Sequence, residues 1–285
     1  MTKKVLVTGG AGFIGSNLIE FLVNNTDYGI WSLDDYSTGS VENHIDGVSY
    51  IKGSTIDIKN KIDFVPDIIF HLGEYARVEK SFDDVRKVWE SNKKGTFEVL
   101  EFCRENNVKI VYAGSSTKFA DGGMGRDQSP YAWTKASNTE LVRNYGTWFN
   151  IPYAITYFYN VYGPRERGGE YGTVIEIFKQ KYKKGEALDV VSPGVQVRNF
   201  THVDDIVRGI YLVGEKGSGD DYGLGDERGY RIIDIAKMFT NNINMLPERK
   251  GNRMSSVVDV SRAKNEFGWF AEKGVEDYIK KIVSN

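Results

Sequence analysis

The stretch Thr8-Gly9-Gly10-Ala11-Gly12-Phe13-Ile14-Gly15 decides the fold. Its glycines at 9, 12 and 15 follow a short apolar run and precede a helical pattern, which is the setting of a phosphate-binding turn. Such a turn needs a positive φ, bare backbone where a pyrophosphate approaches, and close packing of helix on sheet. The helix N-terminus then offers free N–H groups and partial positive charge to an anion. The stretch therefore predicts a strand, a dinucleotide-binding turn and a helix.

An acidic pair, Asp34 and Asp35, follows about 20 residues after this turn. Asp34 ends a second predicted strand, at residues 30–33, where a carboxylate can accept hydrogen bonds from both ribose hydroxyls. The same carboxylate repels a 2′-phosphate, so the pair favours NAD over NADP. The alternative, a glycine turn beside a solvent-exposed aspartate, explains fewer of these features.

The first part of the chain alternates short β-branched runs with longer helical patterns. This alternation predicts a parallel sheet with helices on both faces, hence an α/β fold. We expect strands at 4–8, 30–33, 48–52, 68–72, 109–113 and 153–158, and helices at 13–24, 83–106 and 131–149. After residue 160 the pattern is less regular, with helices expected at 173–184, 203–215, 232–242, 261–267 and 275–283 and strands near 189–191 and 198–201. We therefore predict a dinucleotide-binding domain at 1–160 and a smaller substrate lobe at 161–285, parts of which return to the first domain near 195–215.

Composition excludes several classes of protein. The 285 residues include 37 Lys and Arg against 39 Asp and Glu, so the basic surplus of a nucleic-acid binder is missing. Cys103 is the single cysteine, which fits a reducing compartment, and no run of ~18 apolar residues suggests a membrane span. We expect a cytoplasmic protein without nucleic-acid or membrane partners. His44, His71 and His202 lack the spacing of a metal site, so we expect no metal, a buried His71 and a core Cys103.

Tyr131 and Lys135 stand at i and i+4 of a predicted helix and so share one face. A phenol alone is a poor base near neutral pH, with a pKa of ~10, and a cation held nearby favours the phenolate. That phenolate can remove a proton from a hydroxyl while hydride leaves the same carbon. The hydroxyl cluster at 115–117 ends the preceding strand, where a side chain can bind the reacting oxygen. A Tyr-x-x-x-Lys pair also occurs by chance, but this placement favours catalysis.

Together these motifs resemble the extended short-chain dehydrogenase/reductase family, in its NAD-dependent sugar-nucleotide epimerase/dehydratase branch, whose UDP-hexose 4-epimerases are the nearest in pattern. Further matching segments extend the resemblance over nearly the whole chain. They are 33–39, 66–72, Asn92 with Gly95 and Thr96, 159–165, 197–205 and, loosely, 249–252. The resemblance implies a Rossmann-type doubly wound parallel sheet with a smaller C-terminal α/β substrate lobe.

The resemblance also assigns roles to residues. Ser115 takes the catalytic hydroxyl position, Tyr131 is the acid/base, and Lys135 tunes Tyr131 and binds the nicotinamide ribose. The cofactor NAD would contact Gly9, Gly12, Phe13, Ile14, Gly15, Asp34, Asp35, Ser54, Thr55, Leu72, Gly73, Glu74, Asn92 and Lys135. The sugar nucleotide would contact Arg77, Asn160, Arg198, Arg249, Asn252 and Ser256, although Arg198 and Arg249 are alternatively surface charges.

The chain departs from the family pattern at several of these positions. Ser54 replaces an aspartate near the adenine, and Asn199 and Asn252 replace aspartates around the nucleotide. Gly73-Glu74 replaces two alanines that line the cofactor, so Glu74 either tunes the site or pairs with a nearby lysine. Arg77 lies where small residues are common, within reach of the substrate.

The resemblance leaves the reaction to be decided by few residues. In family 4,6-dehydratases an Asp-Glu pair follows the catalytic hydroxyl, whereas Ser116 and Thr117 stand there in this chain. This favours a 4-epimerase, acting on a UDP-hexose or, because Ser256 is small where an aromatic restricts the pocket, a UDP-N-acetylhexosamine. A dehydratase that recruits Glu74 and a C4 dehydrogenase or reductase remain alternatives. A non-catalytic NAD-binding sensor protein is a remote one.

The two long predicted helices, at 83–106 and 131–149, form a homodimer interface in the family. Their apolar side chains pack either in the core or across that interface, and Gly95 within the first helix predicts close packing there. These side chains are Trp89, Phe97, Leu100, Val142, Tyr145 and Phe149. We therefore expect a homodimer.

Overall fold

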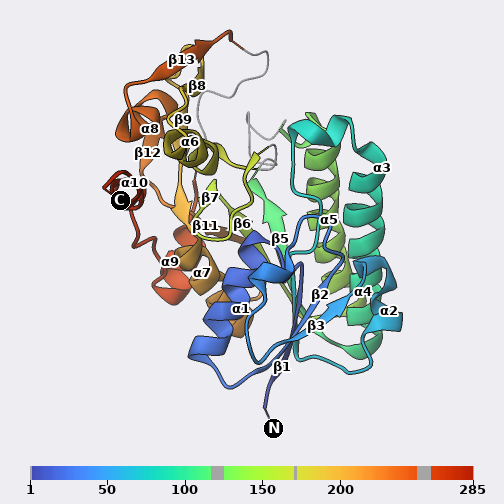
Figure 1. Cartoon of the computed structure of the whole chain (residues 1–285). Helices are drawn as coiled ribbons and strands as arrows, with labels where there is room; N and C mark the ends of the chain where they lie inside the picture. The colour runs from blue at the N-terminus through green and yellow to red at the C-terminus, as the bar shows by residue number, and fades with distance from the viewer. Residues whose placement is uncertain (1, 117–124, 170–171, 249–257, 285) are drawn as a thin grey trace. The chain divides into compact units, whose positions relative to one another are not determined.

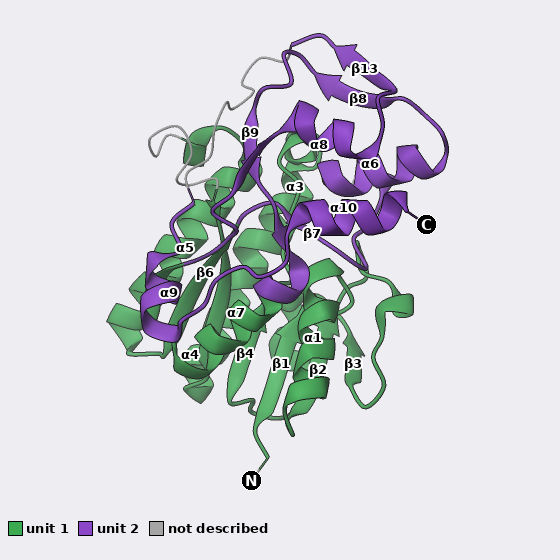
Figure 2. Cartoon of the chain, turned by 90° about the vertical axis from the view of Figure 1, so that its left-hand side faces the viewer, with its two compact units in different colours: residues 1–158, 207–222 green, residues 159–206, 223–285 purple. Residues whose placement is uncertain are grey.

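The computed structural model describes residues 2–116, 125–169, 172–248 and 258–284. The chain divides into two compact units, coloured separately in Figure 2. Unit 1 comprises residues 1–158 and 207–222, and unit 2 comprises 159–206 and 223–285. Within the described residues, no helix combines the length and the apolar character needed to cross a bilayer.

Unit 1 is built on a seven-stranded sheet in the order β11-β6-β5-β4-β1-β2-β3. The pairs from β6 to β3 are all parallel. The strands are β1 (Lys4–Thr8), β2 (Gly29–Asp34), β3 (Ser49–Lys52), β4 (Ile68–His71), β5 (Lys109–Ser115), β6 (Tyr153–Phe158) and β11 (Gly219–Leu224). Because the strand order reverses between β1 and β4, the loops that follow these two strands flank the position where such sheets bind ligands.

Helices cover both faces of this sheet, with α1 (Phe13–Asn25) on one face and α4 (Gly95–Asn106) and α5 (Pro130–Phe149) on the other (Figure 1). The sheet is apolar on both faces, as buried parallel strands must be, and Leu6, Ile69 and Ile110 are fully buried. The remaining elements of unit 1 are α2 (Ile58–Lys61), α3 (Val85–Val88), η1 (Val41–Asn43), η2 (Thr55–Asp57), η3 (Glu79–Phe82), η4 (Trp89–Lys94) and part of α7 (Val203–Lys216). This architecture confirms the predicted α/β fold with a doubly wound parallel sheet.

The predicted continuous helix at 83–106 is wrong in one respect. The helical segment begins at Val85, and a π-helical turn, η4, interrupts it at residues 89–94. The wide turn directs Asn92 inward, where its side chain binds the backbone N–H and C=O of Tyr75. Immediately after it, a Cβ on Gly95 would lie 2.2 Å from Thr55 Oγ1, which confirms the predicted close packing.

The described part of unit 2 contains three two-stranded sheets and its own apolar core. The strand pairs are β7 (Val161–Tyr162) with β10 (Thr201–His202), β8 (Leu188–Val191) with β13 (Ile243–Leu246), and β9 (Val197–Asn199) with β12 (Gly229–Arg231). Its helices are α6 (Val174–Lys183), α8 (Ile232–Phe239), α9 (Ser261–Phe267) and α10 (Val275–Val283). Phe178, Leu188 and Ile235 lie in the core that α6, β8 and α8 share. The helix predicted at 232–242 is wrong at its end, because Thr240 is extended and the chain enters β13 at Ile243.

Candidate active site

The glycine-rich turn after β1 has the tight geometry that its sequence predicts. Gly9 has a φ of +73°, and a Cβ there would lie 2.8 Å from Gly73 Cα in the loop after β4. A Cβ on Gly15 would lie 2.1 Å from Gly9 O, so only glycine allows the helix to start this close to the turn. Helix α1 has no side-chain cap at Gly12 and no acidic residue in its first turn. Its N-terminus is therefore suited to the pyrophosphate of a dinucleotide.

Asp34 ends β2 and is largely buried, with 7% of its surface exposed. Its Oδ2 accepts a hydrogen bond from Ala11 N at 2.9 Å, and its Oδ1 accepts one from Tyr36 N at 2.8 Å. Burial raises the pKa of this carboxyl, and the two N–H donors oppose that effect. Each oxygen retains a lone pair that can accept a ribose hydroxyl.

A cavity in unit 1 brings most of the predicted cofactor residues together. Its lining includes Gly9, Gly12, Phe13, Ile14, Gly15, Asp34, Asp35, Ser54, Thr55, Leu72, Gly73, Glu74 and Lys135, with Tyr131 and the predicted substrate residue Arg77. The lining also includes residues that we did not predict, namely Leu33, Ser37, Thr38, Gly53, Tyr75, Ala76, Ser91, Ala113, Gly114 and Phe158. Many of these residues lie at the carboxyl end of a strand or in the loop after it, which is where parallel sheets bind ligands. The bare turn, the open helix end and Asp34 together fit NAD.

Asn92, which the sequence also predicts as a cofactor contact, is not among the residues that line this cavity. It is fully buried, and its Nδ2 donates to Tyr75 O and to Thr134 Oγ1, both at 3.1 Å. Its Oδ1 accepts from Tyr75 N at 2.7 Å. Asn92 therefore holds the chain that follows Glu74 against the start of α5.

Helix α5 begins with a strong local signal and places Tyr131 in its first turn. Ser129 is the N-cap and accepts a hydrogen bond from Ala132 N at 3.0 Å, and Pro130 occupies the first helical position. The Tyr131 hydroxyl donates to Ser115 Oγ at 3.4 Å. Since Ser115 ends β5, the end of this strand and the start of α5 bring the two hydroxyls into contact.

Lys135 follows one helical turn later and is 5% exposed. Its ammonium group donates to Ala113 O in β5 and forms an ion pair with Glu74. The lysine and the glutamate side chains are 6% and 4% exposed, so the pair is buried. Of the two roles that the sequence left open for Glu74, pairing with a nearby lysine is the one observed.

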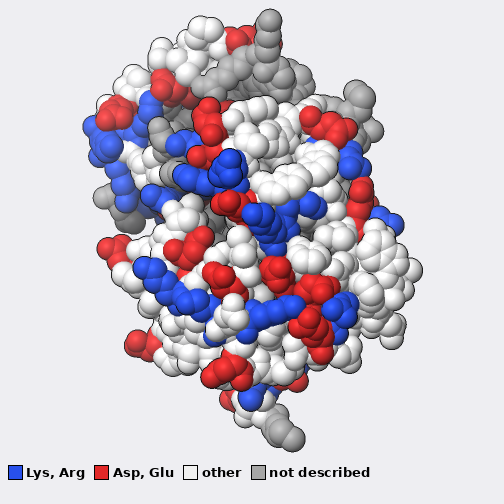
Figure 3. All heavy atoms as spheres, turned by 90° about the vertical axis from the view of Figure 1, so that its right-hand side faces the viewer, with Lys and Arg blue, Asp and Glu red and all other residues white. Residues whose placement is uncertain are grey.

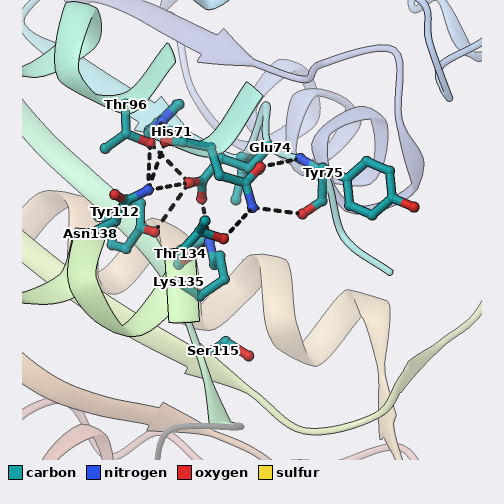
Figure 4. Close-up of polar contacts among 12 residues, drawn as sticks. His71, Glu74, Tyr75, Thr96, Tyr112, Ser115, Thr134, Lys135 and Asn138 are labelled. Carbon is teal, nitrogen blue, oxygen red and sulfur yellow. Dashed lines mark hydrogen bonds and ion pairs between the residues drawn. The ribbon is translucent and has the colours of Figure 1, made fainter. Parts of the chain in front are cut away.

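Three further donors reach the Glu74 carboxylate, as Figure 4 shows. Its Oε1 accepts hydrogen bonds from Thr96 Oγ1 at 2.9 Å, Asn138 Nδ2 at 2.9 Å and the Tyr112 hydroxyl at 3.2 Å. Burial tends to raise the pKa of this carboxyl, but Lys135 and the hydrogen bonds outweigh burial and hold it below its usual value. Glu74 is therefore a carboxylate at neutral pH.

In unit 2 the structure describes two of the predicted substrate residues, Asn160 and Arg198, which lie near the same strand, β9. Asn160 is exposed, with a φ of +37°, and its Nδ2 donates to Asn199 O at 2.9 Å. Arg198 lies next to Asn199 in β9 and donates to Val197 O at 2.8 Å. Arg249, Asn252 and Ser256, together with Thr117, lie outside the described residues.

Several large aromatic side chains of η4, α4 and α5 are exposed. Figure 3, which views the molecule from the side on which these elements lie in Figure 1, shows acidic and basic side chains interspersed with uncharged patches. The exposed aromatic side chains of these helices are Trp89, Phe97, Trp133, Trp148 and Phe149, whereas Leu100, Val142 and Tyr145 are buried. Within the described residues, no group of three or more His, Cys, Asp and Glu side chains is placed to hold a metal ion.

The fold and the cavity define a class of protein, in which a parallel α/β sheet binds a dinucleotide at its switch point beside a tyrosine–lysine couple. The profile of the NAD dependent epimerase/dehydratase family matches residues 5–225, and the chain belongs to this family. Its cofactor is NAD, and sugar nucleotides are the substrate class of its relatives.

Three relatives illustrate the range of the family. A putative UDP-glucose 4-epimerase of Methanocaldococcus jannaschii is 28% identical, over 98% of this chain and 97% of its own length. The dTDP-glucose 4,6-dehydratase of Escherichia coli is 26% identical, over 98% of this chain and 92% of its own. The structure of a UDP-glucose 4-epimerase from Thermotoga maritima with UDP-glucose superposes with a TM-score of 0.91 at 27% identity, covering 99% of this chain and 97% of that one.

Proposed function

We propose that this protein is a sugar-nucleotide 4-epimerase that acts by reversible hydride transfer at the sugar C4, on a UDP-hexose or a UDP-N-acetylhexosamine. The observation that carries the proposal is that Tyr131, which contacts Ser115, and Lys135 line the same cavity as the glycine-rich turn. All three side chains come from β5 and α5, two elements in direct contact.

In this proposal bound NAD supplies the acceptor, and then the donor, of the hydride. Tyr131 removes the proton from the C4 hydroxyl and later returns it, which is the task of a general acid/base. Ser115 donates a hydrogen bond to the reacting oxygen and orients the phenol through their mutual contact. Lys135 supplies a cation within the same helix turn and a donor for the nicotinamide ribose.

The acidic residues of the cavity support epimerisation over dehydration. Removal of the C5 proton in a dehydratase needs a free base, and Ser116 occupies the position after Ser115 where family dehydratases carry a carboxylate. In the described part of the chain, the carboxylates that line the cavity are Asp34, Asp35 and Glu74. Asp34 and Asp35 lie at the end of β2, the position assigned to the ribose of the cofactor and not to the sugar. Glu74 is already bound by Lys135 and three other donors, which makes it a weak base.

Isotope labelling tests the reaction directly. UDP-glucose and UDP-N-acetylglucosamine carrying deuterium at C4 are incubated with the enzyme, and unlabelled substrates are incubated in heavy water. We expect the C4 epimer, with the label kept at C4 and no solvent deuterium at C5, without any added oxidant. Accumulation of a 4-keto-6-deoxy sugar, or deuterium at C5 or C6, identifies a dehydratase. Stoichiometric NADH with a 4-keto sugar identifies a C4 dehydrogenase, and NAD binding without turnover identifies a sensor.

The substrate contacts of the proposal divide between diphosphate and sugar. We assign Asn160, Arg198, Arg249 and Asn252 to the nucleotide diphosphate, because arginine and amide groups suit phosphate oxygens. Arg77, which lines the cavity, and Ser256 are assigned to the sugar side. If Ser256 is the gate, Ser256→Tyr excludes the N-acetylhexosamine nucleotide and spares the plain hexose. An equal loss with both substrates contradicts this assignment.

We also propose that the chain forms a homodimer through its two long helical segments, 83–106 and 131–149. The exposed aromatic face supports this, since Trp89 and Trp133 are 47% and 38% exposed and stack with centroids 5.8 Å apart. Sedimentation should give a dimer mass, and Trp89→Glu with Trp133→Glu should give a monomer. Val41→Glu, at an exposed site on η1, is the control. A wild-type chain that sediments as a monomer contradicts the proposal.

A further inference from the structure

We propose that Glu74 is a positioning residue that holds Lys135 and offsets its charge at the nicotinamide, so that the site does not disfavour oxidised NAD relative to NADH. The inference rests on the proposed function in one respect, the assignment of the Tyr131 and Lys135 end of the cavity to the nicotinamide. It concerns the binding of the cofactor rather than the fate of the sugar.

The first observation is how completely Lys135 is held. Its ammonium lies between the Glu74 carboxylate and Ala113 O, and 4.5 Å from the centre of the Tyr112 ring. Figure 4 shows the lysine and glutamate side chains pointing toward each other from α5 and from the loop after β4. Because both side chains are almost fully buried, solvent cannot screen the charge of either one. Glu74 thus fixes both the position and the electrostatic effect of the ammonium.

The second observation is a chain of hydrogen bonds that keeps Glu74 ionised. Thr8 Oγ1 accepts from the backbone N–H groups of Leu72 and Gly73, at 3.2 and 3.0 Å, so its own proton goes to His71 Nδ1 at 2.7 Å. His71 then carries its proton on Nε2 and donates it to Thr96 Oγ1 at 3.0 Å. Thr96 in turn donates to Glu74 Oε1.

Burial lowers the pKa of His71 to about 4, so the ring is neutral at physiological pH and this order of donors is kept. Each link of the chain directs an O–H or N–H toward Glu74. Asn138 and Tyr112 add two more donors from α5 and β5. The carboxylate is therefore a permanent negative charge beside Lys135, built by residues from five elements of unit 1.

The consequence concerns the charge of the nicotinamide. The ring is positively charged in NAD and neutral in NADH, so an uncompensated ammonium beside it would disfavour NAD alone. With Glu74 in contact, the pair is neutral overall and this penalty disappears. An epimerase must start each cycle with oxidised cofactor, and the pair lets the resting site hold that form without this penalty.

Binding measurements on the cofactor-free full-length protein test the proposal without any sugar present. The dissociation constants of NAD and NADH are measured by calorimetry for the wild type and for Glu74→Gln, which keeps the side-chain shape and an acceptor oxygen. We expect the ratio Kd(NAD)/Kd(NADH) to rise at least tenfold, through weaker binding of NAD, while Kd(NADH) changes less than about threefold. Equal weakening of both forms means a purely structural role and overturns the proposal.

Two further variants fix the sign of the effect. Lys135→Met leaves Glu74 with the donors Thr96, Tyr112 and Asn138 and, at alkaline pH where the carboxyl stays ionised, should lower the same ratio. The double variant Glu74→Gln/Lys135→Met should restore the ratio to near the wild-type value. If Glu74→Gln does not fold, the Lys135→Met measurement decides, and an unchanged ratio there overturns the proposal. Glu101→Gln is the matched control, since Glu101 is also ion-paired but lies on α4 outside the cavity lining. An epimerase with an unchanged ratio refutes only this inference, and a dehydratase with the expected ratio refutes only the proposed function.

Discussion

Two buried carboxylates line the same cavity, and their pKa values shift in opposite directions. Asp34 meets only neutral donors of the backbone, at Ala11 and Tyr36, and burial raises its pKa. The Glu74 side chain is also buried, with 4% of its surface exposed, yet contact with Lys135 holds its pKa below the usual value. Burial alone therefore does not decide how a carboxyl titrates; the charge of its partner does.

The difference matches two tasks. Asp34 presents oxygens that can accept ribose hydroxyls and a charge that repels a 2′-phosphate, so we assign it to cofactor selection. Glu74 turns its oxygens inward to Lys135, Thr96, Tyr112 and Asn138, so we assign it to holding the cation of Lys135.

The largest effect is expected at the reacting end, from Tyr131→Phe. The change removes only the phenolic oxygen that contacts Ser115, so NAD should bind as before while kcat falls by ~10²–10⁴-fold, the usual contribution of a general acid/base. Steady-state kinetics and a NAD titration check this. Tyr153→Phe, at the start of β6 and away from the cavity lining, is the control. A variant that retains more than about a tenth of the rate places the base elsewhere.

A smaller effect is expected from Gly95→Ala, at the start of α4. Gly95→Ala forces a Cβ to within 2.2 Å of Thr55 Oγ1, which should lower the free energy of unfolding by ~1–3 kcal/mol. Denaturant unfolding measures this loss. Adding Thr55→Ala removes the opposing oxygen and should recover part of it, as expected of residues in contact. Strictly additive losses would show that the two residues do not meet.

How much of this site could be predicted depends on how far apart its residues are in the chain. The glycine turn, Asp34 and the Tyr131–Lys135 couple were predictable because each is a local pattern with fixed spacing. The π-helical turn at 89–94 could not be predicted, because it accompanies the contact of Asn92 with the backbone of Tyr75, which helical periodicity does not encode.

The surroundings of Glu74 show the same limit. Its partners come from β5, α4 and α5, which are far apart in the chain. The sequence therefore predicted pairing with a lysine only as one of two possible roles. In unit 2, β7 and β10 are two residues long and β12 is three, too short to produce an alternating pattern. Those strands form because the surrounding core positions them.

Cofactor selection by Asp34 should be a tenfold effect or somewhat more. Wild-type protein should bind NAD at least about tenfold more tightly than NADP, because the carboxylate repels the 2′-phosphate. Asp34→Ser should narrow that gap, chiefly by improving NADP binding. Calorimetric titration with both cofactors gives the ratio, and Asp46→Ser, at an exposed carboxylate outside the cavity lining, serves as the control. Comparable affinities in the wild type would contradict the assignment of Asp34.

The smallest effect separates the two carboxylates by pH. The pKa of Asp34 is raised, so Asp34 should gain its proton at a higher pH than the ~3.9 of a free aspartate, and the preference for NAD over NADP should begin to fall as the pH is lowered toward that range. The pKa of Glu74 is lowered, so the ratio Kd(NAD)/Kd(NADH) should stay constant over the same interval. The 2′-phosphate of NADP also titrates, with a pKa near ~6, and loses part of its charge in this range. In Asp34→Ser the NAD/NADP affinity ratio changes with pH through the 2′-phosphate alone. The difference between the wild-type and variant ratios therefore reports the titration of Asp34. A wild-type preference that follows the variant at every pH would show that Asp34 stays ionised, and that its backbone donors outweigh burial.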